Sequence, residues 1–209
     1  MARVAWFAVL MLVSFHAWAG KIEAHVVTPA GMPVEDAAVV LEPVVGTVIQ
    51  EHTTAKIEQR DREFIPYVTV VQTGTAIEFP NRDPFKHHVY SFSQAKIFEI
   101  KLYAGKPARP VVFDKPGEVA LGCNIHDWME AYILVVNSSY FAKTNSKGVA
   151  HIIDVPSGRY RLRYWHPLQK SILAPHEIEI GDTLIRLEQR MDISPRIAKP
   201  KPPADAGTY

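Results

Sequence analysis

The sequence consists mainly of short stretches in which apolar and polar residues alternate, separated by turns that contain proline and glycine. The strongest stretch is 159–165, where Tyr160, Leu162 and Tyr164 fall on one face of an extended chain. No segment shows convincing apolar periodicity of the kind that marks an amphipathic helix. Because alternation with a period of two indicates half-buried strands, we predict an all-β fold.

The turn residues divide the chain into a series of expected strands. Residues 60–63, Arg-Asp-Arg-Glu, are expected to form a charged loop between two of them. In chain order the expected strands are 21–27, 37–41, 55–59, 67–71, 75–79, 87–92, 97–102, 108–113, 118–121, 132–136, 141–144, 149–153, 159–165, 172–173, 177–180 and 183–188.

Residues 1–19 have the pattern of a secretory signal peptide. Arg3 precedes an apolar run, and Ala17-Trp18-Ala19 gives the small-x-small pattern of a cleavage site. The run is too short and uneven to span a bilayer comfortably, so we expect a periplasmic or secreted protein without an integral membrane span. Removal of Arg3 leaves 22 of the 23 basic residues against 22 acidic ones. This balance does not favour a nucleic-acid or acidic-membrane partner.

Cys123 is the only cysteine, so it cannot form an internal disulfide in an oxidising compartment. His126 and Met129 follow it at three-residue steps. A thiolate, an imidazole and a thioether form a soft donor set that suits copper, provided that a second imidazole is available. His87 or His88, at the start of the expected strand 87–92, supplies one. The alternatives are a buried, inert thiol and a zinc site, in which the thioether has no role.

Two segments resemble the halves of a cupredoxin, the family of type 1 blue copper proteins. The first is 64–92, Phe-x-Pro-x4-Val-x2-Gly-Thr-x3-Phe-x-Asn-x-Asp-x3-His-x-Val. The second is 113–136, which contains Phe113, Gly117 and the Cys123 loop. The spacing Cys-x2-His-x2-Met is similar to the short loop of amicyanin. The resemblance implies a Greek-key sandwich over about 53–137.

The same resemblance implies one type 1 copper ion bound by His87, Cys123, His126 and Met129. The Asn-x-Asp-x3-His pattern favours His87, and His88 is the alternative. His88 occupies the place of the asparagine that is common in cupredoxins, and Leu121-Gly122 stands where an aromatic residue is common.

The flanking segments resemble a carboxypeptidase-regulatory-like domain, a small prealbumin- or Ig-like β-sandwich. The resemblance is carried by Gly31-x-Pro33-Val34-x-Asp36-Ala37 and by 148–162. We therefore expect residues 20–50 and 138–192 to form one sandwich, with the cupredoxin inserted into it or packed on it. Residues 193–209, rich in proline and lysine, are expected to be a disordered tail.

The expected function is one-electron transfer and not catalysis, because four protein ligands leave no position open for a substrate. The loop sequence Cys-Asn-Ile-His-Asp-Trp-Met resembles that of exported cupredoxin-like proteins associated with bacterial methylamine utilisation. This resemblance implies a cytochrome or quinoprotein dehydrogenase as redox partner. One alternative is a copper-delivery or accessory protein for a redox enzyme. Another is a non-redox structural or carbohydrate-binding β module, although Trp165 is expected to lie in the core or a turn and not on a sugar-binding surface.

Overall fold

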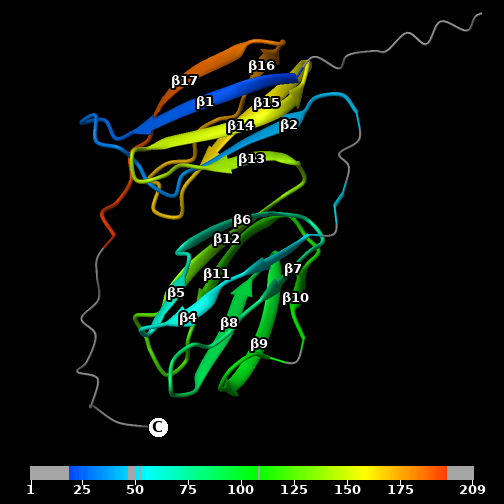
Figure 1. Cartoon of the computed structure of the whole chain (residues 1–209). Coiled ribbons are helices and arrows are strands. Elements are labelled where there is room, and N and C mark those ends of the chain that lie inside the picture. The colour runs from blue at the N-terminus through cyan, green and yellow to red at the C-terminus, as the bar shows by residue number, and fades with distance from the viewer. Residues whose placement is uncertain (1–18, 47–49, 52, 108, 197–209) are drawn as a thin grey trace, which may run out of the picture.

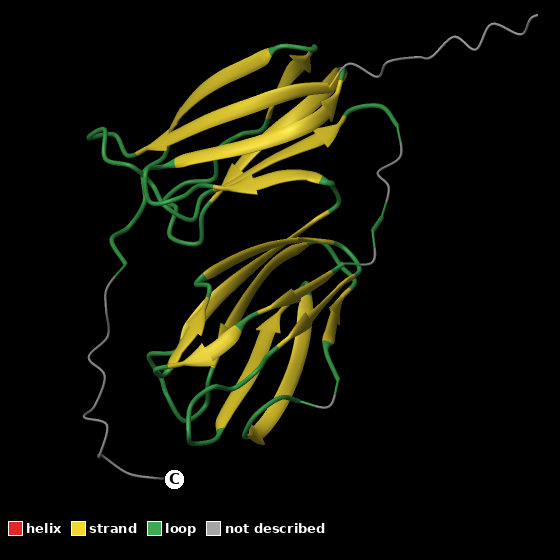
Figure 2. Ribbon diagram, in the orientation of Figure 1, coloured by secondary structure: helices red, strands yellow, loops and turns green. Residues whose placement is uncertain are grey.

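The computed structural model describes residues 19–46, 50, 51, 53–107 and 109–196, and within these ranges every regular element is a strand (Figure 2). The predicted all-β fold is confirmed. No helix that could cross a membrane occurs among the described residues. The predicted signal peptide lies outside them, except for Ala19, which begins the first strand.

The strands fall into two groups that occupy different parts of the chain (Figure 1). The flanking group comprises β1 (Ala19–Val27), β2 (Ala38–Pro43), β13 (Tyr140–Lys143), β14 (Val149–Pro156), β15 (Gly158–Trp165), β16 (His176–Ile180) and β17 (Leu184–Arg190). The central group comprises β3 (Thr54–Lys56), β4 (Glu58–Arg60), β5 (Glu63–Ile65), β6 (Val68–Gln72), β7 (Thr75–Glu78), β8 (His87–Ser93), β9 (Lys96–Tyr103), β10 (Val111–Phe113), β11 (Gly117–Gly122) and β12 (Glu130–Val136).

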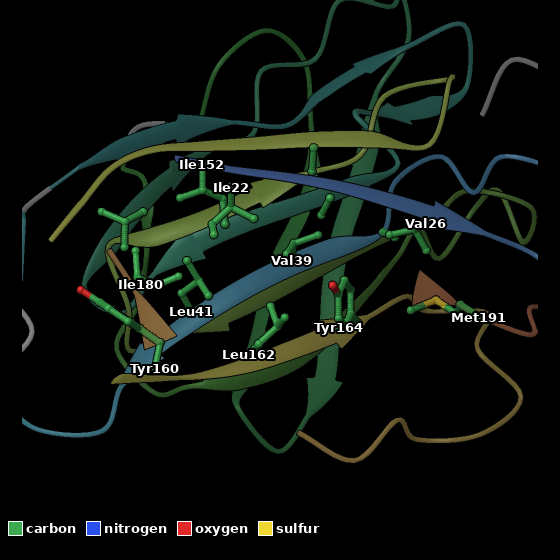
Figure 3. Close-up of a cluster of buried hydrophobic side chains, with 14 of the residues drawn as sticks. Ile22, Val26, Val39, Leu41, Ile152, Tyr160, Leu162, Tyr164, Ile180 and Met191 are labelled. Atoms are coloured by element: carbon green, nitrogen blue, oxygen red, sulfur yellow. The ribbon is translucent and has the colours of Figure 1, made fainter. Parts of the chain in front are cut away.

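The flanking group is a sandwich of two sheets, in the orders β14-β1-β17 and β13-β2-β15-β16. Alternate residues of β1 and β15 are buried, as their sequence patterns predict. Figure 3 shows Ile22 and Ile152 of one sheet facing Leu41 and Leu162 of the other. The assignment of this sandwich to the carboxypeptidase-regulatory-like class stays a prediction.

The central group also forms a layered structure, with a five-stranded sheet in the order β6-β12-β11-β8-β9 and a three-stranded sheet β10-β7-β3. The short hairpin β4-β5 stands beside them. Phe79, Phe113 and Ile133 are among the fully buried side chains of its core. Cys123 and Met129 belong to the same buried cluster, so these two predicted donors lie within the packed interior.

A third apolar cluster joins the two groups. Trp165 and Val40 of the flanking sandwich pack with Val68 and Leu134 of the central one. The Nζ atom of Lys143 also donates a hydrogen bond to the Val68 carbonyl at 2.9 Å. Trp165 is only 3% exposed, which confirms that it is a core residue.

Two local predictions were wrong, and a third was wrong only in its bounds. The expected strand 55–59 is divided into β3 and β4, which pair with different neighbours. The expected loop 60–63 is a tight turn at Asp61 and Arg62, while Arg60 and Glu63 already pair as strand residues of β4 and β5. Residues 172–173 form no strand, because this segment has no pairing partner and Ile172 is 88% exposed.

The chain also remains ordered beyond the predicted start of the tail. Ile193 forms a β-bridge with Gln169, and the Ser194 amide donates to the Leu168 carbonyl at 2.8 Å. These contacts attach 193–194 to the turn that follows β15. Residues 197–209 lie outside the described part of the chain.

Candidate metal centre

Strand pairing brings Cys123, His87 and His126 together from distant parts of the sequence. His87 is the first residue of β8. Cys123 directly follows β11, whose last residue Gly122 pairs with Tyr90 of β8. His126 lies in the short loop between β11 and β12. Because β11 lies next to β8, the loop after β11 is placed beside the start of β8.

The three donor atoms form a compact triangle. The Cys123 Sγ atom lies 3.9 Å from the His87 Nδ1 atom and 3.7 Å from the His126 Nδ1 atom. The two Nδ1 atoms are 3.1 Å apart. The point equidistant from all three lies about 2.1 Å from each, close to the roughly 2.0–2.3 Å over which imidazole nitrogen and thiolate sulfur bind zinc. The residues therefore fit a single transition-metal ion in size as well as in chemistry.

The Asp83 carboxylate binds the His87 ring through the nitrogen that does not face Cys123. The His87 Nε2 atom lies 2.6 Å from the Asp83 Oδ2 atom, and the His87 side chain is fully buried. A carboxylate at this position accepts the Nε2 proton, which leaves the Nδ1 lone pair available on the side that faces Cys123.

The hydrogen-bond donors around Asp83 favour its ionised carboxylate form. Burial raises the pKa of Asp83, but the Arg62 amide, the His87 ring and the Asp61 amide outweigh burial, so the pKa of Asp83 is lower than usual. Asn81 fixes the same loop, because its Nδ2 atom donates to the carbonyls of Phe85 at 2.7 Å and Tyr103 at 3.0 Å.

His126 is the least buried of the three donors. Burial lowers the pKa of His126, and the nearby His87 and Arg62 lower it further against the opposing effect of Asp83. A lowered pKa keeps the imidazole neutral, which is the form that binds metals. The ring packs against Trp128, with the ring centres 5.0 Å apart, and against Phe85 at 5.9 Å.

His88 lies outside the cluster. Its Nε2 atom is 2.8 Å from the Glu99 Oε1 atom, and its ring packs against Tyr90 on the same strand. Neighbouring residues of a strand point to opposite faces of the sheet, so His87 and His88 cannot both face Cys123. The structure thus places His87, and not His88, among the candidate donors.

Met129 is buried in the same apolar cluster as Cys123 and is 2% exposed. Its amide donates to the His126 carbonyl at 2.9 Å, which closes the loop into a tight turn. Its role as an axial ligand stays a prediction.

The residues that support the donors from outside the cluster were not predicted from the sequence. Asp83 entered only as part of a motif, and 60–63 was expected to be a loop with no role in the site. The four-residue spacing between Asp83 and His87 was a usable signal for the first. The amides of Asp61 and Arg62 left no comparable signal, because any residue carries a backbone amide.

Comparison with known proteins gave matches only among solved structures. Neither a protein-family model nor a curated protein matches the chain. A purple cupredoxin from Nitrosopumilus maritimus is 19% identical, with 39% of this chain and 99% of that chain covered and a TM-score of 0.35. A reduced amicyanin variant is 12% identical, with 47% and 98% covered and a TM-score of 0.37. A copper-containing nitrite reductase from Thermus scotoductus is 24% identical, with 54% and 28% covered and a TM-score of 0.38.

Each of these likenesses covers only part of the chain, at TM-scores well below 0.5. The donor geometry, and not these likenesses, therefore bears on the function of the chain.

Proposed function

We propose that this protein binds one copper ion through Cys123, His87 and His126, with Met129 as a weak axial ligand, and acts as an exported one-electron carrier of the cupredoxin type. The observation that carries the proposal is the convergence of the Cys123 Sγ atom and the two Nδ1 atoms around one point. Two imidazoles and a thiolate are the equatorial donors of a blue copper site.

Bound copper would supply reversible one-electron chemistry. The chain would supply a rigid, largely dry setting for it. Cys123 and His87 are buried at the ends of paired strands, so their positions need not change when charge changes. His126 is more exposed, and its ring edge is the proposed route by which electrons enter and leave.

The role of carrier follows from the ligand count, since four protein ligands leave no open position for a substrate. Export to the periplasm is proposed from residues 1–19. The redox partner is proposed to be a cytochrome or a quinoprotein dehydrogenase, with methylamine utilisation as the candidate pathway. These finer proposals are supported by sequence features alone.

The test is the visible and EPR spectrum of the copper-loaded chain from Gly20 onward. We expect an intense thiolate-to-copper absorption and a narrow copper hyperfine splitting. His87→Ala should abolish both. His88→Ala is the matched control and should retain both, because its ring is directed to Glu99. An unchanged spectrum in His87→Ala would overturn the ligand assignment.

The same preparations separate the other functions. Tight Cu(I) binding without the thiolate absorption would support a copper-delivery role in place of electron transfer. Metal binding that survives Cys123→Ser would support a structural or carbohydrate-binding module whose site does not use the thiol.

A further inference from the structure

The hairpin turn between β4 and β5 contacts two residues that touch the candidate imidazoles. These are Asp83, which binds the His87 ring, and Trp128, which packs on the His126 ring. Asp61 and Arg62, the central residues of this turn, have positive φ angles of 55° and 58°. Two successive left-handed residues form a tight turn between antiparallel strands. In this turn both backbone amides donate to the same acceptor, the Asp83 carboxylate.

Both carboxylate oxygens of Asp83 accept hydrogen bonds. Oδ1 accepts from the Asp61 amide at 2.7 Å. Oδ2 accepts from the Arg62 amide at 3.0 Å and from the His87 Nε2 atom at 2.6 Å. The carboxylate is almost completely buried, with 6% of its side chain exposed. The turn therefore fixes Asp83, and Asp83 fixes the orientation of the His87 ring.

The same turn also contacts Trp128, the residue that packs on His126. The Trp128 Nε1 atom donates to the Arg62 carbonyl at 3.2 Å, and the Arg62 guanidinium lies 6.0 Å from the centre of the Trp128 ring. Trp128 in turn packs on His126. The amide of Arg62 thus supports His87 through Asp83, and its carbonyl supports His126 through Trp128.

The hairpin is itself anchored to the loop that carries Asp83. The Gln59 amide donates to the Pro80 carbonyl at 2.9 Å, and the Arg82 amide donates to the Gln59 carbonyl at 2.7 Å. Phe64 on β5 is buried in the central core. The turn is therefore held on both sides and can act as a fixed support.

We propose that the β4-β5 hairpin is a clamp that orients His87 and His126 before metal binds, with Asp83 and Trp128 as its positioning residues. The proposal rests on the proposed copper function. Preorganised donors lose little free energy to ordering when the metal enters, and outer hydrogen bonds of this kind commonly raise metal affinity.

The main test is Asp83→Asn. An amide side chain has one acceptor oxygen, so in either orientation its NH₂ group faces at least one N–H donor of the present network. We expect Cu(II) affinity to fall about 10- to 100-fold. NMR of the metal-free variant should show loss of the single His87 tautomer that carries its proton on Nε2. It should also show about tenfold faster hydrogen exchange at the amides of Asp61 and Arg62.

Matched variants isolate the contacts. Glu58→Gln removes a charge from the same hairpin without touching Asp83, because Glu58 pairs with Arg82, and it should leave affinity and tautomer unchanged. Arg62→Gly retains the turn amide at a positive φ angle and should retain the tautomer. Trp128→Phe keeps an aromatic ring on His126 but removes the donor to Arg62, so it should weaken copper binding and leave the His87 tautomer intact.

The outcomes separate this proposal from the copper assignment. Copper bound through Cys123 with normal affinity in both Asp83→Asn and Trp128→Phe would overturn the clamp and leave the copper assignment standing. A wild-type chain that binds no copper through Cys123 would overturn the proposed function. The metal-free NMR measurements would then decide the clamp by themselves, and Trp128→Phe supplies the test if Asp83→Asn does not fold.

Discussion

At the scale of single residues, the two adjacent histidines show how the pleat of a strand selects a donor. Sequence spacing favoured His87 and left His88 as the alternative. The structure directs His87 toward Cys123 and His88 toward Glu99. This separation could be anticipated from strand alternation, but only if the register of β8 against β11 was known. Register depends on pairing across the sheet, which no local pattern determines.

The axial position is best tested by Met129→Leu. The change conserves volume in the core, so we expect stability to fall by less than about 1.5 kcal/mol. If the thioether is a ligand, its loss leaves a three-donor site that favours Cu(I), and the reduction potential should rise. Voltammetry of the copper-loaded variant measures this shift.

Met191→Leu is the control, because Met191 is equally buried but lies in the flanking core. Equal potentials in the wild-type protein, Met129→Leu and Met191→Leu would show that the Met129 sulfur does not bind the metal.

At the scale of elements, the long alternating strands were predictable and the short hairpin was not. β15 and β1 carry clear period-two patterns that locate them to within two residues. β4 and β5 have three residues each, and their turn lacks the asparagine-glycine or aspartate-glycine pair that marks most such hairpins. Asp61 and Arg62 adopt the turn because Asp83 binds their amides, a contact that lies far away in the sequence.

Two glycines allow the cost of a turn conformation to be separated from the cost of crowding. Gly31 and Gly148 both have positive φ angles, 81° and 73°. A Cβ atom on Gly31 would meet nothing within 4 Å, whereas one on Gly148 would lie 2.5 Å from the Val26 carbonyl oxygen. Gly31→Ala should therefore cost about 1–2 kcal/mol of stability from backbone strain alone.

Gly148→Ala should cost a further 1–3 kcal/mol or so, because backbone atoms must move. Urea unfolding of the two variants gives both free energies. Equal losses would contradict the crowding at Gly148 and the close approach of β1 to the turn before β14.

At the scale of the whole molecule, sequence similarity to two kinds of sandwich suggested a composite chain, but it gave no indication of how the parts meet. The contact is made by apolar side chains from both groups of sheets, with Trp165 among its largest members. Two of the contributing strands, β2 and β12, each carry four consecutive buried apolar residues, which indicates that both faces of the strand are covered. Only the packing of complete sheets shows which side chains of the other group cover them.

Trp165→Ala tests whether this contact couples the two sandwiches. We expect a loss of about 3–5 kcal/mol and a thermal transition that separates into two steps, because the apolar contact between the groups is largely removed. Differential scanning calorimetry measures both effects.

Ile172→Ala is the control and should change stability by less than about 0.5 kcal/mol, since Ile172 is almost fully exposed. A single thermal transition with an unchanged midpoint in Trp165→Ala would show that the contact contributes little to the stability of the protein.

X-ray absorption at the copper edge of the loaded chain reports whether one copper ion is bound jointly by the Cys123 sulfur and the imidazoles of His87 and His126. We expect one sulfur and two imidazole nitrogens at about 2.0–2.3 Å from the metal, with this sulfur contribution lost in Cys123→Ser. A copper ion surrounded only by nitrogen and oxygen, or one whose coordination does not change in Cys123→Ser, would overturn the proposed site.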